Sequence, residues 1–327
     1  MRTLEKNIKA VIGTVAAAAI SLLTSAALAF PDKPIRLIVP QPPGGAGDVI
    51  GRMLAENLKT VLGQPVLAEN RAGAAGVIAA ETVARAAPDG YTLLIGGGST
   101  HGANSALNRK LSYDPIKDFA PISLLVRAEW GMFVNPAFPA STTGELIALA
   151  KAKPGAINFA SAGLGSASQL IMEQFVAMTG IDLVHIPYKG SVAAQVGALT
   201  NDAQVVFDGI GNASAQVKAG KLNMIAVASA RRSPLAPGTP TIAESGVPGF
   251  EASSAFGIYA PAGTPKEVVA TLNRAIVNVL KQPEFRQWLT SQAYEIVGSS
   301  PEQLAEEVAR EIRKWRQLAQ ERNLKFD

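Results

Sequence analysis

The sequence predicts an α/β fold, and three observations lead to this prediction. Short apolar runs alternate with longer segments whose apolar residues recur at helical spacing. Several of the apolar runs end in glycine-rich loops that lead into the next helical segment. No unit of roughly 20–50 residues repeats along the chain, which argues against solenoids and propellers. Such alternation is typical of parallel sheets with helices on both faces.

The predicted strands are buried apolar runs, and the predicted helices lie between them. We expect strands at residues 35–39, 66–68, 91–95, 157–159, 183–186, 205–207 and 225–228. Helices are expected at residues 49–61, 76–86, 168–179 and 192–200. Residues 121–134 and 251–261 are longer β-type runs that break the regular alternation.

Two further helices are predicted in the C-terminal part, each from a start signal. Thr264 and Ser300 each supply a capping hydroxyl before a proline, and Glu267 and Gln303 follow as the third helical residue. Apolar residues then recur at helical spacing from Val268 onward. The last helix is amphipathic, and we interpret its charged face as solvated.

Residues 1–29 have the pattern of a secretory signal peptide. A positively charged start precedes an apolar run over residues 10–23, and Ala27 and Ala29 are the small residues that a signal peptidase reads. We therefore expect cleavage after Ala29 and export to the periplasm. A permanent membrane anchor is the alternative, because the apolar run nearly reaches the span of a bilayer. The cleavage motif and the polar residues near it favour a removed signal.

Charge and cysteine content exclude several classes of protein. The net charge is +4, of which +2 lies in the predicted signal peptide, and no basic run follows. Nucleic acid or an anionic membrane surface would require clustered lysine and arginine, so neither is an expected partner. The absence of cysteine excludes disulfides, cysteine-ligated zinc and thiol catalysis. Two distant histidines form no metal-ligand cluster, so we expect neither a metal nor a cofactor.

Four predicted strands end in small, polar, glycine-rich loops, at residues 41–48, 96–102, 161–168 and 208–212. Ligands of open α/β sheets bind at the carboxyl ends of the strands, where these loops lie. Helix N-termini at such loops present unpaired N–H groups and a partial positive charge. One loop of this kind is most often only a tight connection. Four together predict an anion site that requires no cationic side chain.

Sequence strings along the chain carry a family resemblance. They are Phe30-Pro31-Asp32-Lys33-Pro34-Ile35, the Pro-Pro-Gly-Gly loop, Glu69-Asn70-Arg71, Ala87-Pro88-Asp89-Gly90-Tyr91, Tyr113-Asp114-Pro115, Lys117-Asp118-Phe119-Ala120-Pro121, Phe207-Asp208 and residues 148–155, 158–163, 184–190, 218–221, 260–265 and 297–299. Over essentially the whole chain after residue 29, the sequence resembles the tripartite tricarboxylate transporter receptors, also called Bug proteins. The resemblance implies a type II periplasmic binding protein fold, in which two doubly wound α/β lobes enclose a ligand cleft.

The same resemblance implies how the chain is divided and what it does. One lobe would comprise residues 30–127 and 254–327, and the other residues 128–253. The protein would be a monomeric, non-catalytic receptor for a small organic carboxylate, either a dicarboxylate or an aromatic acid. It would deliver this ligand to a two-subunit membrane permease. Presentation of the ligand to a two-component sensor is the alternative that the sequence leaves open.

The resemblance also implies which residues hold the ligand. The ligand-binding residues carried over by position are Pro43, Gly44, Gly45, Asp48, Ser99 and Thr100 in the first lobe, and Ser161, Gly163, Gly165, Ser166, Ala167 and Ser168 in the second, with Asp208 nearby. Four residues depart from the family pattern: Gln41 stands where Phe is common, Gly47 where Thr or Ser is usual, Gln169 where His is frequent and Ala255 where Trp or Tyr is frequent.

The departures make Gln41, Gln169 and Ala255 candidate specificity residues, and His101, in a ligand-facing loop, is a fourth. Small residues at positions 47 and 255 predict a ligand bulkier than a four-carbon diacid, with an aromatic acid as one form. A neighbouring Phe256 could instead fill that space. Trp130, near the expected hinge, is the tryptophan that would report lobe closure.

Two enzyme classes fit the sequence less well than a receptor. For a dinucleotide-dependent enzyme, Gly45 and Gly47 follow a strand and Glu69 stands at a suitable distance for a ribose contact, but the third glycine is displaced to Gly51. A hydrolase lacks the Gly-x-Ser-x-Gly elbow, and only His101 and His185 could act as a base. His185 falls within an apolar strand pattern, where a core histidine is the better interpretation.

Overall fold

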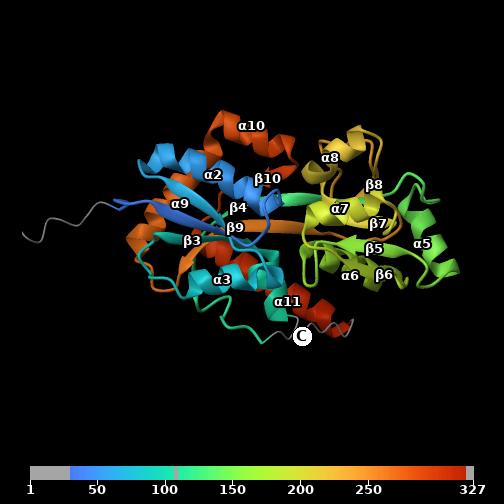
Figure 1. The fold of residues 1–327 in the computed structure, drawn as a ribbon, viewed down its shortest axis with the longest axis horizontal. Coiled ribbons are helices and arrows are strands. Elements are labelled where there is room, and N and C mark those ends of the chain that lie inside the picture. The colour runs from blue at the N-terminus through green and yellow to red at the C-terminus, as the bar shows by residue number, and fades with distance from the viewer. Residues whose placement is uncertain (1–29, 107–109, 322–327) are drawn as a thin grey trace, which may run out of the picture.

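The computed structural model describes residues 30–106 and 110–321, so the predicted signal peptide lies outside the described residues. Within them, two groups of strands and helices lie side by side, and two long strands, β4 (Phe119–Val134) and β9 (Ser253–Pro261), run through the middle of the molecule (Figure 1). The strands join in one sheet with the order β2-β1-β3-β9-β4-β7-β5-β6, and β8 and β10 also pair with β4.

The first group contains the N-terminal and C-terminal elements. Its strands are β1 (Ile35–Val39), β2 (Val66–Asn70), β3 (Thr92–Gly97) and β10 (Tyr294–Ile296). Its helical segments are α2 (Ala46–Leu62), η1 (Ala74–Gly76), α3 (Val77–Ala84), η2 (Gly98–Ala103), α4 (Asn104–Ala106), α9 (Lys266–Lys281), α10 (Pro283–Ser291) and α11 (Pro301–Glu321).

The second group is formed by the middle of the chain. Its strands are β5 (Asn158–Ser161), β6 (Val184–Pro187), β7 (Val205–Gly209) and β8 (Asn223–Val227). Its helices are α5 (Thr143–Ala152), α6 (Ala167–Thr179), α7 (Ser191–Leu199) and α8 (Ile210–Lys218). Among the helices that the structure describes, none is long and apolar enough to cross a bilayer.

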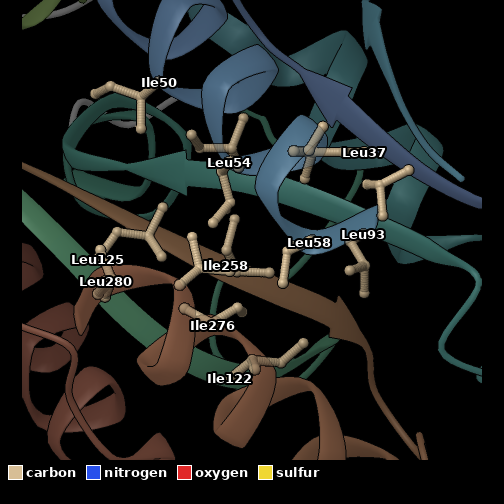
Figure 2. Close-up of a cluster of buried hydrophobic side chains, with 14 of the residues drawn as sticks. Leu37, Ile50, Leu54, Leu58, Leu93, Ile122, Leu125, Ile258, Ile276 and Leu280 are labelled. Carbon is tan, nitrogen blue, oxygen red and sulfur yellow. The ribbon is translucent and has the colours of Figure 1, made fainter. Parts of the chain in front are cut away.

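Each group has its own hydrophobic core. In the first, Leu54 and Leu58 recur four residues apart on α2 and pack with Ile258 of β9 and Ile276 of α9 (Figure 2). In the second, aromatic rings from α6, β7 and the segment before β9 pack edge to face, with Phe175 centred 6.3 Å from Phe207 and 6.0 Å from Phe250. Two cores in one chain are typical of two domains.

The strand β4 belongs to both groups. Up to Glu129 it pairs antiparallel with β9, where Glu129 is opposite Ser253, and β10 flanks its other edge. From Trp130 onward it pairs antiparallel with β7, starting opposite Gly209, and with β8. The prediction of parallel sheets is therefore only partly right. β1, β2 and β3 are parallel, as are β5, β6 and β7, but β4 enters each group from a distant part of the chain and runs against its neighbours.

The two predicted C-terminal helix starts have different outcomes. Ser300 forms the reciprocal capping box, since its hydroxyl accepts from the Gln303 amide and its own amide donates to Oε1 of Gln303. The capping prediction for Thr264 is wrong. Its hydroxyl donates to the carbonyl of Pro261 at 2.8 Å, and Pro265 is the N-cap of α9. The local turn offers Thr264 a nearer acceptor than the helix end.

Candidate functional site

A cleft of about 1460 Å³ opens between the two groups, and all four predicted loops border it. Of the predicted site residues, Pro43, Gly45, Ser99, Thr100, Gly163, Ser166, Ala167, Ser168, Asp208, Gln41 and Ala255 line the cleft. The others, Gly44, Asp48, Ser161, Gly165, His101 and Gln169, are neighbours of the lining residues in the same loops. Their role in binding stays a prediction, and their hydrogen bonds show what they do in the fold.

The loop before α2 is held by side chains from its own neighbourhood. The Gly47 amide donates to Oε1 of Gln41, and the Gly44 amide donates to Oδ2 of Asp48 at 3.0 Å. Asp48 is 4% exposed, and its other oxygen accepts from Arg52 at 2.9 Å and Asn70 at 2.8 Å. The first turn of α2 thus carries its own anion, already paired with a cation.

Gln41 and Gly47 form a single structural unit. A Cβ atom built on Gly47 would lie 2.7 Å from Oε1 of Gln41, which no side chain tolerates without displacing the amide. A residue larger than glycine at position 47 therefore conflicts with this position of the Gln41 side chain. The two departures, which the sequence presented as independent, are coupled through one hydrogen bond.

The loop after β3 rests on a buried histidine. Oγ1 of Thr100 accepts from the Gly97 amide at 2.9 Å and pairs with Nδ1 of His101 at 2.9 Å. The His101 ring is 1% exposed and stacks on Tyr259 with centroids 3.8 Å apart. Burial lowers the pKa of His101 to about 3, so the ring is neutral. The ring contacts Thr100 from behind the cleft wall, and the role of His101 in specificity stays a prediction.

The loop before α6 is a network of neutral hydroxyl groups. Oγ of Ser161 accepts from the Gly163 amide at 3.1 Å and pairs with Nε2 of His185 at 2.6 Å. Oγ of Ser168 accepts from the Ala162 amide at 2.9 Å and lies 3.1 Å from Oγ of Ser166. The latter hydroxyl caps α6.

His185 and Gln169 support this loop from behind. The His185 ring stacks on Phe159 at 4.6 Å, as expected for a packed histidine, and burial lowers its pKa to about 4. Gln169 is 3% exposed, and its Oε1 accepts from the Gly165 amide at 2.7 Å. The carbonyl oxygen of Gln169 thus holds the loop backbone, and its role in specificity stays a prediction.

Glycine is required at two positions of the same loop. Gly163 has φ +125° and Gly165 has φ +74°, a region that residues with a Cβ atom rarely adopt. Both turns bring the backbone around so that Ser166, Ala167 and Ser168 border the cleft at the start of α6. The Ser166 cap accepts from the Gln169 amide, and the amides of the first turn that lack an intrahelical partner can donate to a ligand.

Asp208 is a buried acid at the end of β7. It is 2% exposed and accepts hydrogen bonds from Gln195 at 2.7 Å, the Gly209 amide at 2.7 Å and Asn212 at 3.1 Å. Burial raises the pKa of Asp208, although these three donors act in the opposite direction. Within the described residues, no group of three or more acidic or histidine side chains could hold a metal ion.

Sequence reasoning missed several residues that border the cleft. They include the start of α7 (Tyr188, Lys189, Gly190 and Val192), the η1 turn, Lys110, and Gln292 and Tyr294 near the start of β10. The start of α7 follows the same strand–glycine–helix pattern as the four predicted loops and could have been found by it. The η1 turn, with Gly73 and Gly76 between β2 and α3, follows it as well, whereas Lys110 and the residues near β10 do not.

The two walls approach each other at the mouth of the cleft. A Cβ atom built on Gly190 of the second group would lie 3.4 Å from Cγ of Pro42 in the first, and one built on Gly44 would lie 3.9 Å from Cγ2 of Val192. Pro42 and Val192 line the cleft. Both pairs join residues of different groups, so the two walls lie close together at these positions.

Ala255 borders the cleft and also packs within the first group. Its side chain is 9% exposed and belongs to a cluster with Tyr259 of β9 and Leu304 and Ile312 of α11. Successive side chains of a strand point to opposite faces, so Phe256 takes the other face. Ala255 therefore packs in this cluster while it also borders the cleft, and its effect on the size of the ligand stays a prediction.

The geometry excludes the ribose contact of the dinucleotide alternative. Both carboxylate oxygens of Glu69 accept from the Arg36 guanidinium at 2.8 Å, across the β1–β2 pair, where Glu69 is opposite Ile38. Such a bidentate ion pair holds the Glu69 carboxylate at the edge of the sheet, so both of its oxygens are occupied and neither is available to a ribose.

The fold and cleft are those of a periplasmic binding protein with a mixed, curled sheet. Its similarity to the solved structure of the periplasmic binding protein BugD has a TM-score of 0.85 at 33% sequence identity, over 90% of this chain and 99% of that one. Residues 50–324 match the model of the tripartite tricarboxylate transporter family receptor. The protein BugT of Bordetella pertussis is 36% identical over 318 residues, which cover 97% of this chain and 98% of BugT. The chain belongs to the tripartite tricarboxylate transporter receptor family, a family of periplasmic solute-binding receptors and not of enzymes.

Two similar structures contain a small carboxylate. One is an R. palustris protein with adipate, at 33% identity and a TM-score of 0.87 over 90% of this chain and 99% of that one. The other is MatC from Rhodopseudomonas palustris with bound malate, at 34% identity and a TM-score of 0.84 over 88% and 99%. Both ligands are aliphatic dicarboxylates.

Proposed function

We propose that this chain captures a small organic carboxylate in the cleft and delivers it to a two-subunit membrane permease. The observation that carries the proposal is the convergence of four glycine-rich loops on one cleft, three of them leading into the N-termini of α2, α6 and α8. Backbone amides and hydroxyl groups at helix N-termini favour an anion. The adipate and malate found in similar receptors are anions of this kind.

The charges around the cleft support an anionic ligand. Arg52, 2.9 Å from Asp48, offsets part of the negative charge of that carboxylate. Burial raises the pKa of Asp208, which favours its neutral form. A carboxylate ligand nearby would favour the neutral form further, so Asp208 opposes the ligand less than an ordinary aspartate would. Lys110 and Lys189 border the cleft from opposite groups and add positive potential. We expect these lysines to attract the ligand, while the loops bind it.

Binding would close two lobes over the ligand. We place one lobe at residues 30–127 and 254–327 and the other at 128–253, with β4 and β9 as the connections. The change of pairing partners of β4 between Glu129 and Trp130 supports a division near this point. One copy of the chain supplies both walls, so we propose that the receptor acts as a monomer.

A thermal-shift screen tests the proposed function. Malate, adipate, citrate and benzoate would be compared with their neutral amides at equal concentration. A carboxylate that binds only the folded chain should stabilise it by about 2.7 kcal/mol at 100 times its dissociation constant. Stabilisation by amines, sugars or the amides, with none by any carboxylate, would contradict the proposal.

Export is tested by the N-terminus of the protein recovered from the periplasm. We expect mass spectrometry to find Phe30 as the first residue, because Ala27 and Ala29 form the cleavage motif. Recovery of the chain with Met1 in the membrane fraction would contradict cleavage.

A further inference from the structure

The cleft offers more room than a four-carbon diacid needs. Its volume of about 1460 Å³ exceeds the roughly 300–1,000 Å³ of common small-molecule sites. The loops that would hold a carboxylate occupy only part of its lining. The remaining lining includes a floor made by β4, β9 and β10, where Trp130, Phe256 and Tyr294 border the cleft.

The strand register places these three aromatic residues on one face of the sheet. Ala128 of β4 is opposite Ser254 of β9 on one side and Tyr294 of β10 on the other. Side chains two residues apart on a strand share a face, so Trp130 lies on the face of Ala128, and Phe256 on the face of Ser254. All three aromatic side chains pack on the first hydrophobic core from this face.

The aromatic floor adjoins the loops predicted to bind the carboxylate. Phe256 is opposite Gly97, the last residue before the loop that carries Ser99 and Thr100. Its ring lies 3.3 Å from the position a Cβ atom would take at Gly47 of α2. Trp130 is opposite Gly209, which follows Asp208. A carboxylate held at these loops therefore places the atoms bonded to it over the floor.

Trp130 adds an unsatisfied hydrogen-bond donor. Its Nε1 is buried and has no partner among the described residues. Buried indole N–H groups normally find a partner, so an acceptor supplied by a ligand would complete this site. The ring itself packs against both cores, which fixes its position between the two groups.

We propose that the ligand is an aromatic carboxylate whose ring lies on Trp130, Phe256 and Tyr294 while its carboxylate is held by the loops. This inference rests on the proposed function and narrows it to a substrate class that differs from the aliphatic acids of the similar structures. Offset and edge-to-face contacts with three rings favour an aromatic ligand over a saturated one of the same size.

Calorimetry with matched ligands tests the inference on the wild-type chain. Benzoate and cyclohexanecarboxylate have the same carboxylate and nearly the same size, and adipate and malate represent the aliphatic diacids. We expect benzoate to bind at least about fivefold more tightly than cyclohexanecarboxylate, since aromatic contacts contribute roughly 0.5–1.5 kcal/mol each beyond buried area. Equal or weaker binding of benzoate would overturn the inference. If adipate or malate binds in that case, the proposed function stands, whereas binding of no carboxylate would overturn both.

Two variants of the floor locate the ring. Trp130→Leu and Phe256→Leu keep an apolar side chain on the strand, and each should weaken benzoate binding about 5- to 10-fold while adipate changes by less than about twofold. Trp288→Leu is the matched control, because Trp288 stacks on Phe285 in the same core and is not among the cleft-lining residues. Circular dichroism would confirm that each variant folds. An equal loss for both ligands, or no loss in either floor variant, would overturn the assignment of the floor.

Discussion

The loops before α2 and α6 resemble each other in sequence but differ in charge. Each is rich in glycine, and in each a glutamine Oε1 accepts from a glycine amide, Gln41 from Gly47 and Gln169 from Gly165. The α2 loop, however, carries the buried Asp48 and its partner Arg52. The α6 loop carries only hydroxyl groups, with Ser166 as the helix cap.

This difference shows that two similar helix starts are not equivalent anion sites. The carboxylate of Asp48 lies at the start of α2, where it interacts with the helix dipole and accepts a hydrogen bond from the Gly44 amide. A carboxylate ligand at the same place would therefore be repelled by a like charge. Hydroxyl groups at the start of α6 carry no charge and can turn to donate to a ligand. We therefore expect the α6 wall to supply most of the affinity for the anion.

The largest effect on binding is expected from Gly165→Val. The φ of +74° at this position disfavours a β-branched residue, so the turn that presents the start of α6 would change. Loss of two hydrogen bonds to a charged ligand should reduce its affinity roughly 100-fold or more. Calorimetry with the best-binding carboxylate measures this change.

Gly180→Val is the control for backbone strain. Gly180 has φ +66° at the end of α6, and a Cβ atom built there has nothing within 4 Å. The free energy of unfolding of Gly180→Val should fall about as much as that of Gly165→Val, because both glycines have a positive φ. The affinity of Gly180→Val for the carboxylate should not change. Similar affinities in the two variants would show that the α6 loop does not bind the ligand.

The two walls also differ in the histidine behind each one. Burial lowers the pKa to about 3 for His101 and to about 4 for His185. In the unfolded chain both histidines have a pKa near 6.5. Below this pH the unfolded chain binds protons and the folded chain does not, so the free energy of unfolding decreases as the pH falls toward the pKa values of the folded chain.

His101→Gln should remove up to about 1.4 kcal/mol per pH unit of this dependence between pH 6 and 4. His185→Gln should remove less, because its ring is less buried and its pKa shift is smaller. Urea unfolding at a series of pH values measures both slopes. An unchanged slope in His101→Gln would mean that the ring protonates within the fold.

Ser166→Ala should weaken carboxylate binding by about 10- to 100-fold, because a hydrogen bond to a charged group contributes roughly 1.5–3 kcal/mol. The variant also loses the cap of α6, which costs about 1 kcal/mol of stability. Thr142→Ala, which removes the cap of α5 outside the cleft, is the matched control. Affinity in Ser166→Ala equal to that of the control would remove this hydroxyl from the site.

The smallest effect is expected from Gln41→Ala in the opposite wall. The Gly47 amide would lose its internal acceptor and become available, while Asp48 would continue to repel an anion. These changes oppose each other, so affinity should stay within about twofold of wild type. A tenfold loss measured by calorimetry would show that Gln41 contacts the ligand and that the two walls contribute equally.

Local features of the sequence determined much of this protein. The run at residues 35–39 coincides with β1, and Ser300 with Gln303 forms the expected capping box, because both depend on neighbouring residues. The glycine-rich loops were found for the same reason, since a strand, a turn and a helix start follow one another in the chain. The resemblance to the receptor family, which sequence strings along the chain carry, predicted how these local elements form the whole fold.

Only the tertiary structure decided which of these features meet. Tyr294 lies beside Ala128 because β10 pairs with β4, and nothing near either residue in the sequence specifies that pairing. The coupling of Gln41 with Gly47, the position of Ala255 against α11 and the burial of His101 on Tyr259 likewise depend on side-chain direction and on strands brought together from distant parts of the chain. Pairing and burial are properties of the assembled sheet, so a residue pattern predicts the loops of the cleft but not its floor.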